Sequence, residues 1–248
     1  MKVDIEKYER EFIEDYENGD FERYLTTYRK KKLVNLVKKY KTDNFLEIGC
    51  GMEPFFLVFE NYKNMYVVEP GKRMANHAND LTVGRTNIKI VNGFVEECVE
   101  YLKSFSYDFI LLVGLIHEVE DADLLLESLY SLCSSDTKIL VTTGNPCSFH
   151  LTLAYEAGII SKIGSLTDRA KKYQRNRVFS MDGMKELVKK HGFMIHEEGG
   201  YYIKPFSHYQ MKQMLDLHII DEKVLDGLDN IAKYMPELCA ENYVIVSK

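Results

Sequence analysis

The stretch Leu46-Glu47-Ile48-Gly49-Cys50-Gly51 decides the fold, because it leads from a short apolar strand into a tight glycine turn. A second apolar run ends at Glu69, 20 residues after Gly49. In a doubly wound sheet, a carboxylate at this separation reaches the ribose hydroxyls of a nucleoside bound across the turn. With a helix expected after the turn, the pattern predicts a strand–turn–helix unit that binds a nucleoside cofactor.

Short apolar runs recur along the first part of the chain, with helical sequence between them. This alternation is typical of a doubly wound parallel sheet, whose ligands bind at the carboxyl ends of the strands. The runs cover residues 45–48, 65–69, 88–91, 108–113 and 138–143. We therefore expect the binding site just after these runs.

The remaining segments are predicted to be helical covers and closing strands. Residues 1–42 would form an N-terminal helical cap, and residues 43–248 the main domain. Helical inserts are expected at about 148–190 and 207–241, and the second is long enough to cover the site. Strand segments are expected at 193–195, 201–203 and 243–246. The expected fold is α/β, a doubly wound, seven-stranded, mostly parallel sheet with an antiparallel last strand.

The residues around the turn discriminate between nucleoside cofactors. A dinucleotide-binding G-x-G-x-x-G motif would need glycine where Pro54 stands. Glu47 and Glu53 would also oppose a pyrophosphate at the start of the following helix. S-adenosylmethionine has no phosphate and carries a sulfonium and an ammonium group, which carboxylates suit. The sequence favours it over NAD, while a plain tight turn at Gly49 and Gly51 stays the alternative.

Composition narrows the class of protein further. The net charge of −6 argues against a nucleic-acid partner. Five scattered cysteines and no histidine cluster at zinc spacing predict reduced thiols and no metal site. The N-terminus has no secretion signal, and the apolar run 109–116 is too short to span a bilayer. We expect a cytoplasmic protein without membrane contact, as a monomer or a homodimer.

Together these residues resemble the class I, Rossmann-like S-adenosylmethionine-dependent methyltransferases, over about residues 43–146 and the last two strands. The glycine turn looks like their first motif and Glu69 like their ribose-binding acid. The segments 92–94 and 114–119 look like the adenine-binding turn and the motif after the fourth strand. The resemblance implies S-adenosyl-L-homocysteine as product and the cofactor-binding residues Glu47, Gly49, Cys50, Gly51, Glu69, Pro70, Asn92, Gly93, Phe94, Gly114 and Leu115.

Two positions depart from that family pattern. Glu53 stands where the third glycine of the first motif is usual, which affects the methionine end of the cofactor site. Phe94 replaces the common acidic residue of the adenine turn. We therefore expect adenine to be held by the backbone and the Phe94 ring.

The later part of the chain is similar to a narrower bacterial subgroup of sugar- and surface-polysaccharide-modifying, ubiquinone-type O-methyltransferases. The matching stretches are Asn145–His150, Glu197–Tyr201, Lys204-Pro205 and Pro236–Glu241. The resemblance implies O-methylation of a small polar acceptor, such as a sugar or a sugar-linked metabolite. Alternatives are N-methylation, methylation of a protein or nucleic acid, and a non-catalytic cofactor-binding protein of the same fold.

Methyl transfer to a hydroxyl is helped by a general base, and histidine titrates in the appropriate range. His117 follows the fourth strand and is the first candidate for the catalytic base, and His150 after the fifth strand is the second. Glu118 and Asp121 are expected to begin a helix. The basic stretch 162–177 could bind an anionic acceptor or form a solvated face.

Tyrosines near the expected site have two interpretations each. Tyr24 and Tyr28 could cap the cofactor or pack in the core, and core packing is favoured. Tyr201 and Tyr202 could line the acceptor pocket or be ordinary strand residues. Sequence alone leaves the second pair undecided.

Overall fold

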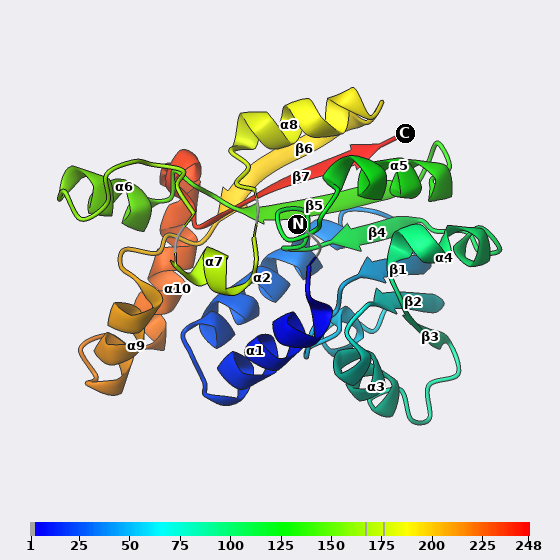
Figure 1. Ribbon diagram of the computed structural model, residues 1–248, viewed down its shortest axis with the longest axis horizontal. Helices are drawn as coiled ribbons and strands as arrows, with labels where there is room; N and C mark the ends of the chain where they lie inside the picture. Colours follow the sequence, from blue (N-terminus) through cyan, green and yellow to red (C-terminus); the bar gives the residue numbers. More distant parts are fainter. Residues whose placement is uncertain (1–2, 167, 176) are drawn as a thin grey trace.

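The computed structural model describes residues 3–166, 168–175 and 177–248, apart from the side chains of residues 168 and 169. In this part of the chain one sheet has the strand order β3-β2-β1-β4-β5-β7-β6, as Figure 1 shows. Strand β7 runs antiparallel to both of its neighbours, β5 and β6, and the other paired strands are parallel. This confirms the predicted fold class. The strands are β1 Asn44–Ile48, β2 Asn64–Glu69, β3 Ile88–Asn92, β4 Phe109–Leu112, β5 Lys138–Gly144, β6 Met194–Tyr201 and β7 Glu241–Ser247.

Helices cover both faces of the sheet, because alternate side chains of each strand point to opposite faces. Phe45 belongs to the core on one face and Leu46 to the core on the other. The first face packs against α2 (Glu22–Val37) and α3 (Lys72–Asp80). The second face packs against α4 (Val95–Leu102), α5 (Ala122–Leu132) and α8 (Met181–Lys190).

The connection from β1 to β2 differs from the sequence prediction. We expected a helix after the glycine turn, but only the short 3₁₀ turn η1 (Phe55–Leu57) follows it. Phe55 and Phe56 are buried in the core with α2, which covers this face of the sheet. Helix α2, which precedes β1 in the sequence, therefore covers the part of the sheet where a helix after the turn was expected. The expectation of an α-helix after the turn was wrong.

The chain forms one long strand, β6, where two short segments at 193–195 and 201–203 were expected. A bulge between Ile195 and Glu197 shifts its register against β7. Gly199 and Gly200 let the strand continue beneath bulky neighbours, since a Cβ at Gly200 would come within 2.5 Å of the Cβ of Cys239. The strand ends at Tyr201, and the next residue, Tyr202, has a φ of 60°.

The other helices gather around the carboxyl ends of the strands. Figure 1 shows α1 and α7 beside these ends, with α6 and α9 projecting at the far left. Their bounds are α1 Ile5–Glu17, α6 Phe149–Glu156, α7 Asp168–Lys172, α9 His208–Asp216 and α10 Glu222–Asn230, followed by the 3₁₀ turns η2 Ile231–Tyr234 and η3 Pro236–Leu238. Among the described residues, no helix has the length and apolarity needed to cross a membrane.

Candidate active site

A cavity of about 2180 Å³ lies at the carboxyl ends of the strands, where the sequence predicted the site. Residues of α1, the segment after α7 and the start of α9 also line it. Of the predicted site residues, the cavity is lined by Glu47, Gly49, Cys50, Gly51, Glu69, Pro70, Gly93, Phe94, Gly114, Leu115, His117 and His150. The fold thus brings together residues that are far apart in the sequence.

Glu69 holds the glycine turn in place. Its Oε2 accepts hydrogen bonds from the backbone N–H groups of Cys50 at 2.9 Å and Gly51 at 3.1 Å. Its Oε1 accepts one from the Gly71 N–H at 2.9 Å. A carboxylate offers about four acceptor positions, and the Cys50 thiol also acts on this one. Glu69 therefore fixes the turn, and its contact with a ribose hydroxyl stays a prediction.

Glu47 lies buried behind the same turn, where both carboxylate oxygens accept from the Phe55 N–H at 2.9 and 3.1 Å. Burial raises the pKa of Glu47 to about 8. The hydrogen bond from the Phe55 N–H and the charge of Lys30 act in the opposite direction and offset this rise only in part. A bound cation would favour the ionised carboxylate. Glu47 therefore suits a cofactor with an ammonium and a sulfonium group.

The three residues of the predicted adenine turn, 92–94, differ in whether they line the cavity. Asn92 does not line the cavity, and its side-chain amide donates to the carbonyls of Glu69 and Pro70 at 2.9 and 3.0 Å. These two hydrogen bonds hold the end of β2 in place. Gly93 and Phe94 do line the cavity, with the Phe94 ring partly exposed. Contacts with adenine at this turn stay a prediction for these two residues.

Helix α1 lies over the glycine turn and closes one side of the cavity. Gly51 has a φ of 56°, and a Cβ there would come within 3.2 Å of the Phe12 ring. Glu9 accepts a hydrogen bond from the Met74 N–H at 2.9 Å, which ties α1 to α3. The ring of Tyr8 stacks on that of Phe12. No sequence motif marked α1 for this position.

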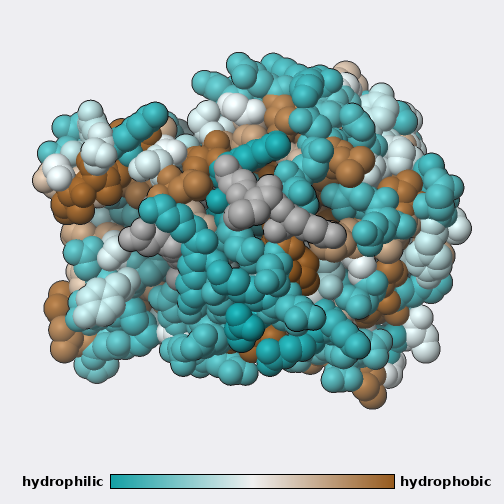
Figure 2. Space-filling view, viewed as in Figure 1, coloured by the Kyte–Doolittle hydropathy of each residue, from teal (hydrophilic) through white to brown (hydrophobic). Residues whose placement is uncertain are grey.

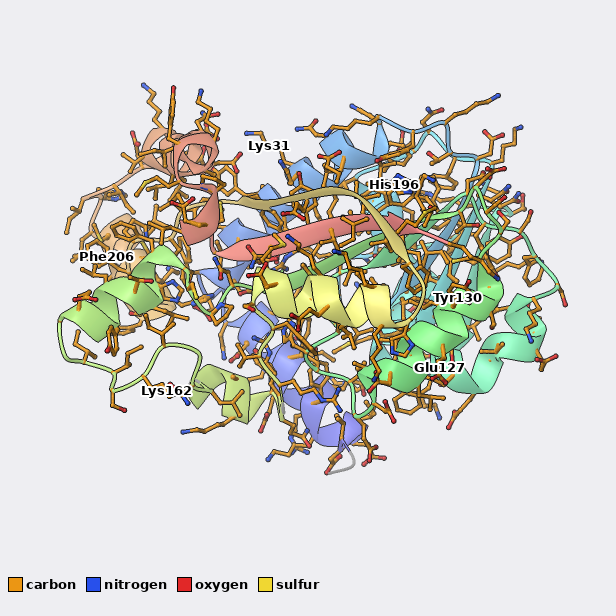
Figure 3. The ribbon with its side chains drawn as sticks, turned by 90° about the horizontal axis from the view of Figure 1, so that it is seen from above. Lys31, Glu127, Tyr130, Lys162, His196 and Phe206 are labelled. Carbon is orange, nitrogen blue, oxygen red and sulfur yellow. The ribbon has the colours of Figure 1, made fainter. Side chains whose placement is uncertain are left out.

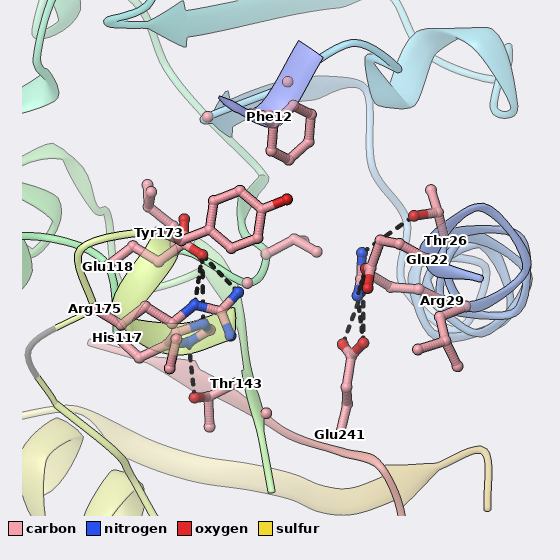
Figure 4. A pocket seen from close by; sticks show the side chains of 18 of the residues that line it. Phe12, Glu22, Thr26, Arg29, His117, Glu118, Thr143, Tyr173, Arg175 and Glu241 are labelled. Atoms are coloured by element: carbon pink, nitrogen blue, oxygen red, sulfur yellow. Dashed lines mark hydrogen bonds and ion pairs between the residues drawn. The ribbon is translucent and has the colours of Figure 1, made fainter. Parts of the chain in front are cut away.

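His117 is buried at the end of β4, across the cavity from Arg29 in Figure 4. Its Nδ1 lies 3.0 Å from Oγ1 of Thr143, at the end of β5. Its Nε2 is buried and has no hydrogen-bond partner among the described residues, although Oε1 of Glu118 lies 3.6 Å away. Burial, and then the charge of Arg175, lower the pKa of His117 to about 4. The imidazole is therefore neutral at physiological pH.

Glu118 has a role that the sequence did not reveal. It accepts hydrogen bonds from the Tyr8 hydroxyl at 2.7 Å and from Arg175, whose Nε lies 2.9 Å away. Through these two bonds, α1 and the segment after α7 are both held against Glu118, the residue that follows His117. The expectation that Glu118 begins a helix was wrong. Asp121 does cap α5, accepting from the N–H groups of Asp123 and Leu124.

A second charged group forms the opposite wall, as Figure 4 shows. Arg29 of α2 binds Glu241 at the start of β7, with its Nε 2.9 Å from Oε2, and also binds Glu22. The Tyr201 hydroxyl donates to Glu241 as well. Sequence analysis did not predict the Arg29–Glu241 pair, because the two residues share no local motif and Arg29 precedes Glu241 by 212 residues. Only the strand order brings them together.

His150 lies in the first turn of α6 and also lines the cavity. Its Nδ1 is 3.1 Å from the Ser148 hydroxyl. Burial lowers the pKa of His150 to about 2, with added effects from Lys204 and His208. The Nζ of Lys204 lies 2.9 Å from Nδ1 of His208. His150 thus faces a positively charged neighbour, whereas His117 lies beside a carboxylate.

Cations of the basic stretch 162–177 meet carboxylates of the protein. Arg175 binds Glu118 at 2.7 Å, and Lys172 binds Asp15 at 2.7 Å. Residues 167 and 176, and the side chains of 168 and 169, lie outside the described residues. The Lys172–Asp15 pair therefore joins α7 to α1, and the Arg175–Glu118 pair ties the segment after α7 to the residue next to His117.

The tyrosines pack in the interior. Tyr24 of α2 packs against the core, and Tyr28 of the same helix is buried within that core, with its ring centroid 4.9 Å from that of Tyr202. Tyr201 and Tyr202 do not line the cavity. The core interpretation of the first pair is confirmed, and the second pair consists of buried strand-end residues. In the described part of the chain, no group of three potential ligands could hold a metal ion.

Comparison with known proteins supports the family. A family model described as a methyltransferase domain matches residues 21–198. No curated protein matches the sequence. A Thermotoga maritima protein, a possible histamine N-methyltransferase, shares the fold with a TM-score of 0.63 and 19% identity, over 98% of each chain.

Two further solved structures share the fold. The plantazolicin methyltransferase in complex with S-adenosylhomocysteine has a TM-score of 0.57 and 16% identity, over 96% of this chain and 89% of that one. Phosphoethanolamine N-methyltransferase 2 of Haemonchus contortus, in complex with S-adenosylmethionine, has a TM-score of 0.56 and 15% identity, over 89% and 52%. The family match and the shared fold support S-adenosylmethionine as the cofactor and methyl transfer as the activity. Because the family model covers more than half of the sequence, the chain belongs to the methyltransferase domain family.

Proposed function

We propose that this enzyme transfers the methyl group of S-adenosylmethionine to a hydroxyl of a small polar acceptor. The acceptor would lie between His117 and the Arg29–Glu241 pair, in the cavity that all three residues line. The resemblance of the later part of the chain points to a sugar or a sugar-linked metabolite. His117 would be the general base.

The observation that carries this proposal is the state of His117. Its Nε2 is buried without a hydrogen-bond partner among the described residues, and an unpaired buried nitrogen is costly unless a ligand meets it. An acceptor hydroxyl would supply the missing hydrogen bond. Because the imidazole is neutral, it can also accept the proton.

The residues around the base then have defined tasks. The cofactor, when bound, supplies a methyl group on a positively charged sulfur, which makes the carbon ready for attack. Thr143 fixes the His117 ring through Nδ1. Arg29, Glu241 and Glu22 present charged oxygens and guanidinium N–H groups opposite, which can orient polar groups of the acceptor. Helix α1, lying over the glycine turn, limits access of water from that side.

An amine acceptor is the second candidate. Among the described residues that line the cavity, twelve are Asp or Glu and seven are Lys or Arg. This balance favours a cationic ligand over an anionic one, and an amine nucleophile needs little help from a base once neutral. Two proteins with the same fold bear N-methyltransferase names, which fits this candidate at the level of fold only.

His117→Gln separates the two candidates. With a hydroxyl acceptor we expect kcat to fall by about 10²–10⁴-fold, the usual worth of a general base, while calorimetry finds the affinity for S-adenosylhomocysteine unchanged. With an amine acceptor, kcat should change little. Turnover is measured as S-adenosylhomocysteine released with panels of glycosides and of primary amines.

His150→Gln is the matched comparison, since His150 lines the same cavity from the neighbouring strand end. A large loss of kcat in His150→Gln, with none in His117→Gln, would transfer the role of base to His150. Nearly full activity of both variants on a glycoside would exclude a histidine base.

A further inference from the structure

The cavity is larger than a cofactor and a small acceptor require. Its volume of about 2180 Å³ compares with roughly 300–1,000 Å³ for pockets that hold drug-sized ligands. From the glycine turn it runs past His150 and ends between α6 and α9, whose residues both line it. The outer part therefore belongs to the same cavity as the reaction site.

The two ends of the cavity differ in polarity. The inner end holds the Arg29–Glu241 pair and the Lys204–His208 contact. In the outer wall, the segment 151–160 has Glu156 as its sole charged residue, and Glu156 does not line the cavity. Its lining residues are all apolar: Leu151, Leu153, Ala154, Ala157, Ile159 and Ile160. A ligand that fills both ends has a polar head and an apolar extension.

The outer apolar side chains lie open to solvent in the described structure. Leu153 is 41% exposed and Ile159 is 77% exposed, and none of the residues of α6 is buried. Across the cavity, Tyr209 of α9 is 70% exposed and Phe206 just before α9 is also exposed. The other lining residues of that wall are polar: Ser207, His208, Gln210, Lys212 and Gln213. Figure 2 shows apolar side chains at this left-hand end, where Figure 3 labels Phe206. Exposed apolar side chains gathered at one end of a cavity are typical of a site that binds an apolar group.

We propose that the acceptor is amphipathic, with its reacting head group at His117 and a hydrocarbon chain lying between α6 and α9. The position of the head rests on the proposed function above. The chain is assigned to the acceptor because the apolar wall formed by α6 and residues 157–160 continues the reaction cavity itself. S-adenosylmethionine is polar at both ends and would leave this part of the cavity to the acceptor.

Burial of a methylene group strengthens binding by about fourfold in Kd. We therefore expect the Kd of n-alkyl β-D-glucosides, and of n-alkylamines, to fall from the methyl to the butyl to the octyl compound. The measurement is calorimetry with the full chain saturated with S-adenosylhomocysteine, at ligand concentrations below those that form micelles. Dependence on chain length for either head group supports the proposal, and its absence for both overturns it.

The double variant Leu153→Ser/Ile159→Ser should remove most of this dependence on chain length. Both side chains are exposed, so the fold does not depend on their burial. The control is Val83→Ser, because Val83 is 87% exposed and does not line the cavity. An unchanged chain-length dependence in the double variant overturns the proposal. If the double variant changes only the sedimentation coefficient, the proposal is also overturned, and the exposed apolar surface of α6 is then a contact between copies of the chain.

The same samples separate this inference from the proposed function. Chain-length dependence together with full activity of His117→Gln overturns the role of His117 and leaves the apolar site standing. Loss of activity in His117→Gln, without chain-length dependence, overturns only the apolar site. Binding of S-adenosylhomocysteine in each variant shows that the fold is intact.

Discussion

At the scale of single residues, the proton state of His117 depends on two opposite charges beside it. Glu118 lies 3.6 Å from its Nε2 and raises its pKa, whereas Arg175, bound to the same carboxylate, lowers it. On the far wall, the charge of Glu241 raises the pKa of His117 and the charge of Arg29 lowers it. Burial is the largest cause of the low pKa. Burial therefore keeps the imidazole neutral, and Arg175 offsets the opposite effect of the Glu118 carboxylate.

Arg175→Gln tests this balance. Removing the guanidinium leaves Glu118 to act on the imidazole without compensation, so the pKa of His117 should rise from about 4 by roughly one unit or more. NMR titration of the His117 ring, assigned with His117→Gln, measures the change. Lys172→Gln is the control, because Lys172 is on the same segment but pairs with Asp15. Equal pKa values in wild type and Arg175→Gln would contradict the argument.

At the scale of elements, two helices that are far apart in the sequence close the cofactor end of the cavity. Helix α1 carries Phe12 over the glycine turn. It is joined to α7 by the Lys172–Asp15 ion pair, and its Tyr8 ring contacts that of Tyr173 just after α7. The insert 207–241 was expected to be the cover. Its first helix, α9, contributes lining residues, but α10 contributes none and packs on α2, where Tyr28 donates to Asp226 at 3.0 Å.

Amide exchange should therefore slow in α1 when S-adenosylhomocysteine binds, and change little in α10. The reason is that opening of α1 would expose the bound cofactor, whereas α10 has no contact with the cavity. Hydrogen–deuterium exchange with mass spectrometry resolves the two helices. Protection confined to α10 would show that the insert is the cover after all.

At the scale of the whole molecule, Glu47 links stability to pH. Its pKa of about 8 in the folded protein lies above the ordinary value of 4.5 that the unfolded chain retains. The folded state thus binds this proton more tightly. The stability that the proton contributes is fully present below about pH 4.5 and is lost as pH rises through about 8.

Glu47→Gln should remove this dependence, because the neutral amide oxygen can still accept the Phe55 N–H. Relative to the variant, the wild type should lose free energy of unfolding between about pH 5 and pH 8, measured by urea denaturation without cofactor. Identical pH profiles for the two proteins would show that Glu47 is ionised in the folded state.

The sequence by itself determined the sheet and the cofactor end of the site. Glycine turns, strand-end acids and apolar alternation are local patterns, and each is fixed by the backbone conformation that a few neighbouring residues can adopt. This is why Glu47, Gly49, Gly51, Glu69 and His117 could be placed from the sequence. The helix expected after the turn failed, because α2, from another part of the chain, fills that face.

Only the tertiary structure decided the rest of the site. The pairs Arg29–Glu241 and Glu118–Arg175 join residues 212 and 57 positions apart, and no local spacing encodes them. They form because the order of the strands brings the ends of β4, β5 and β7 beside helices from the N-terminus and from the middle of the chain. The burial and the charged neighbours of His117 depend on these contacts, so its neutral state followed from the fold and not from its motif.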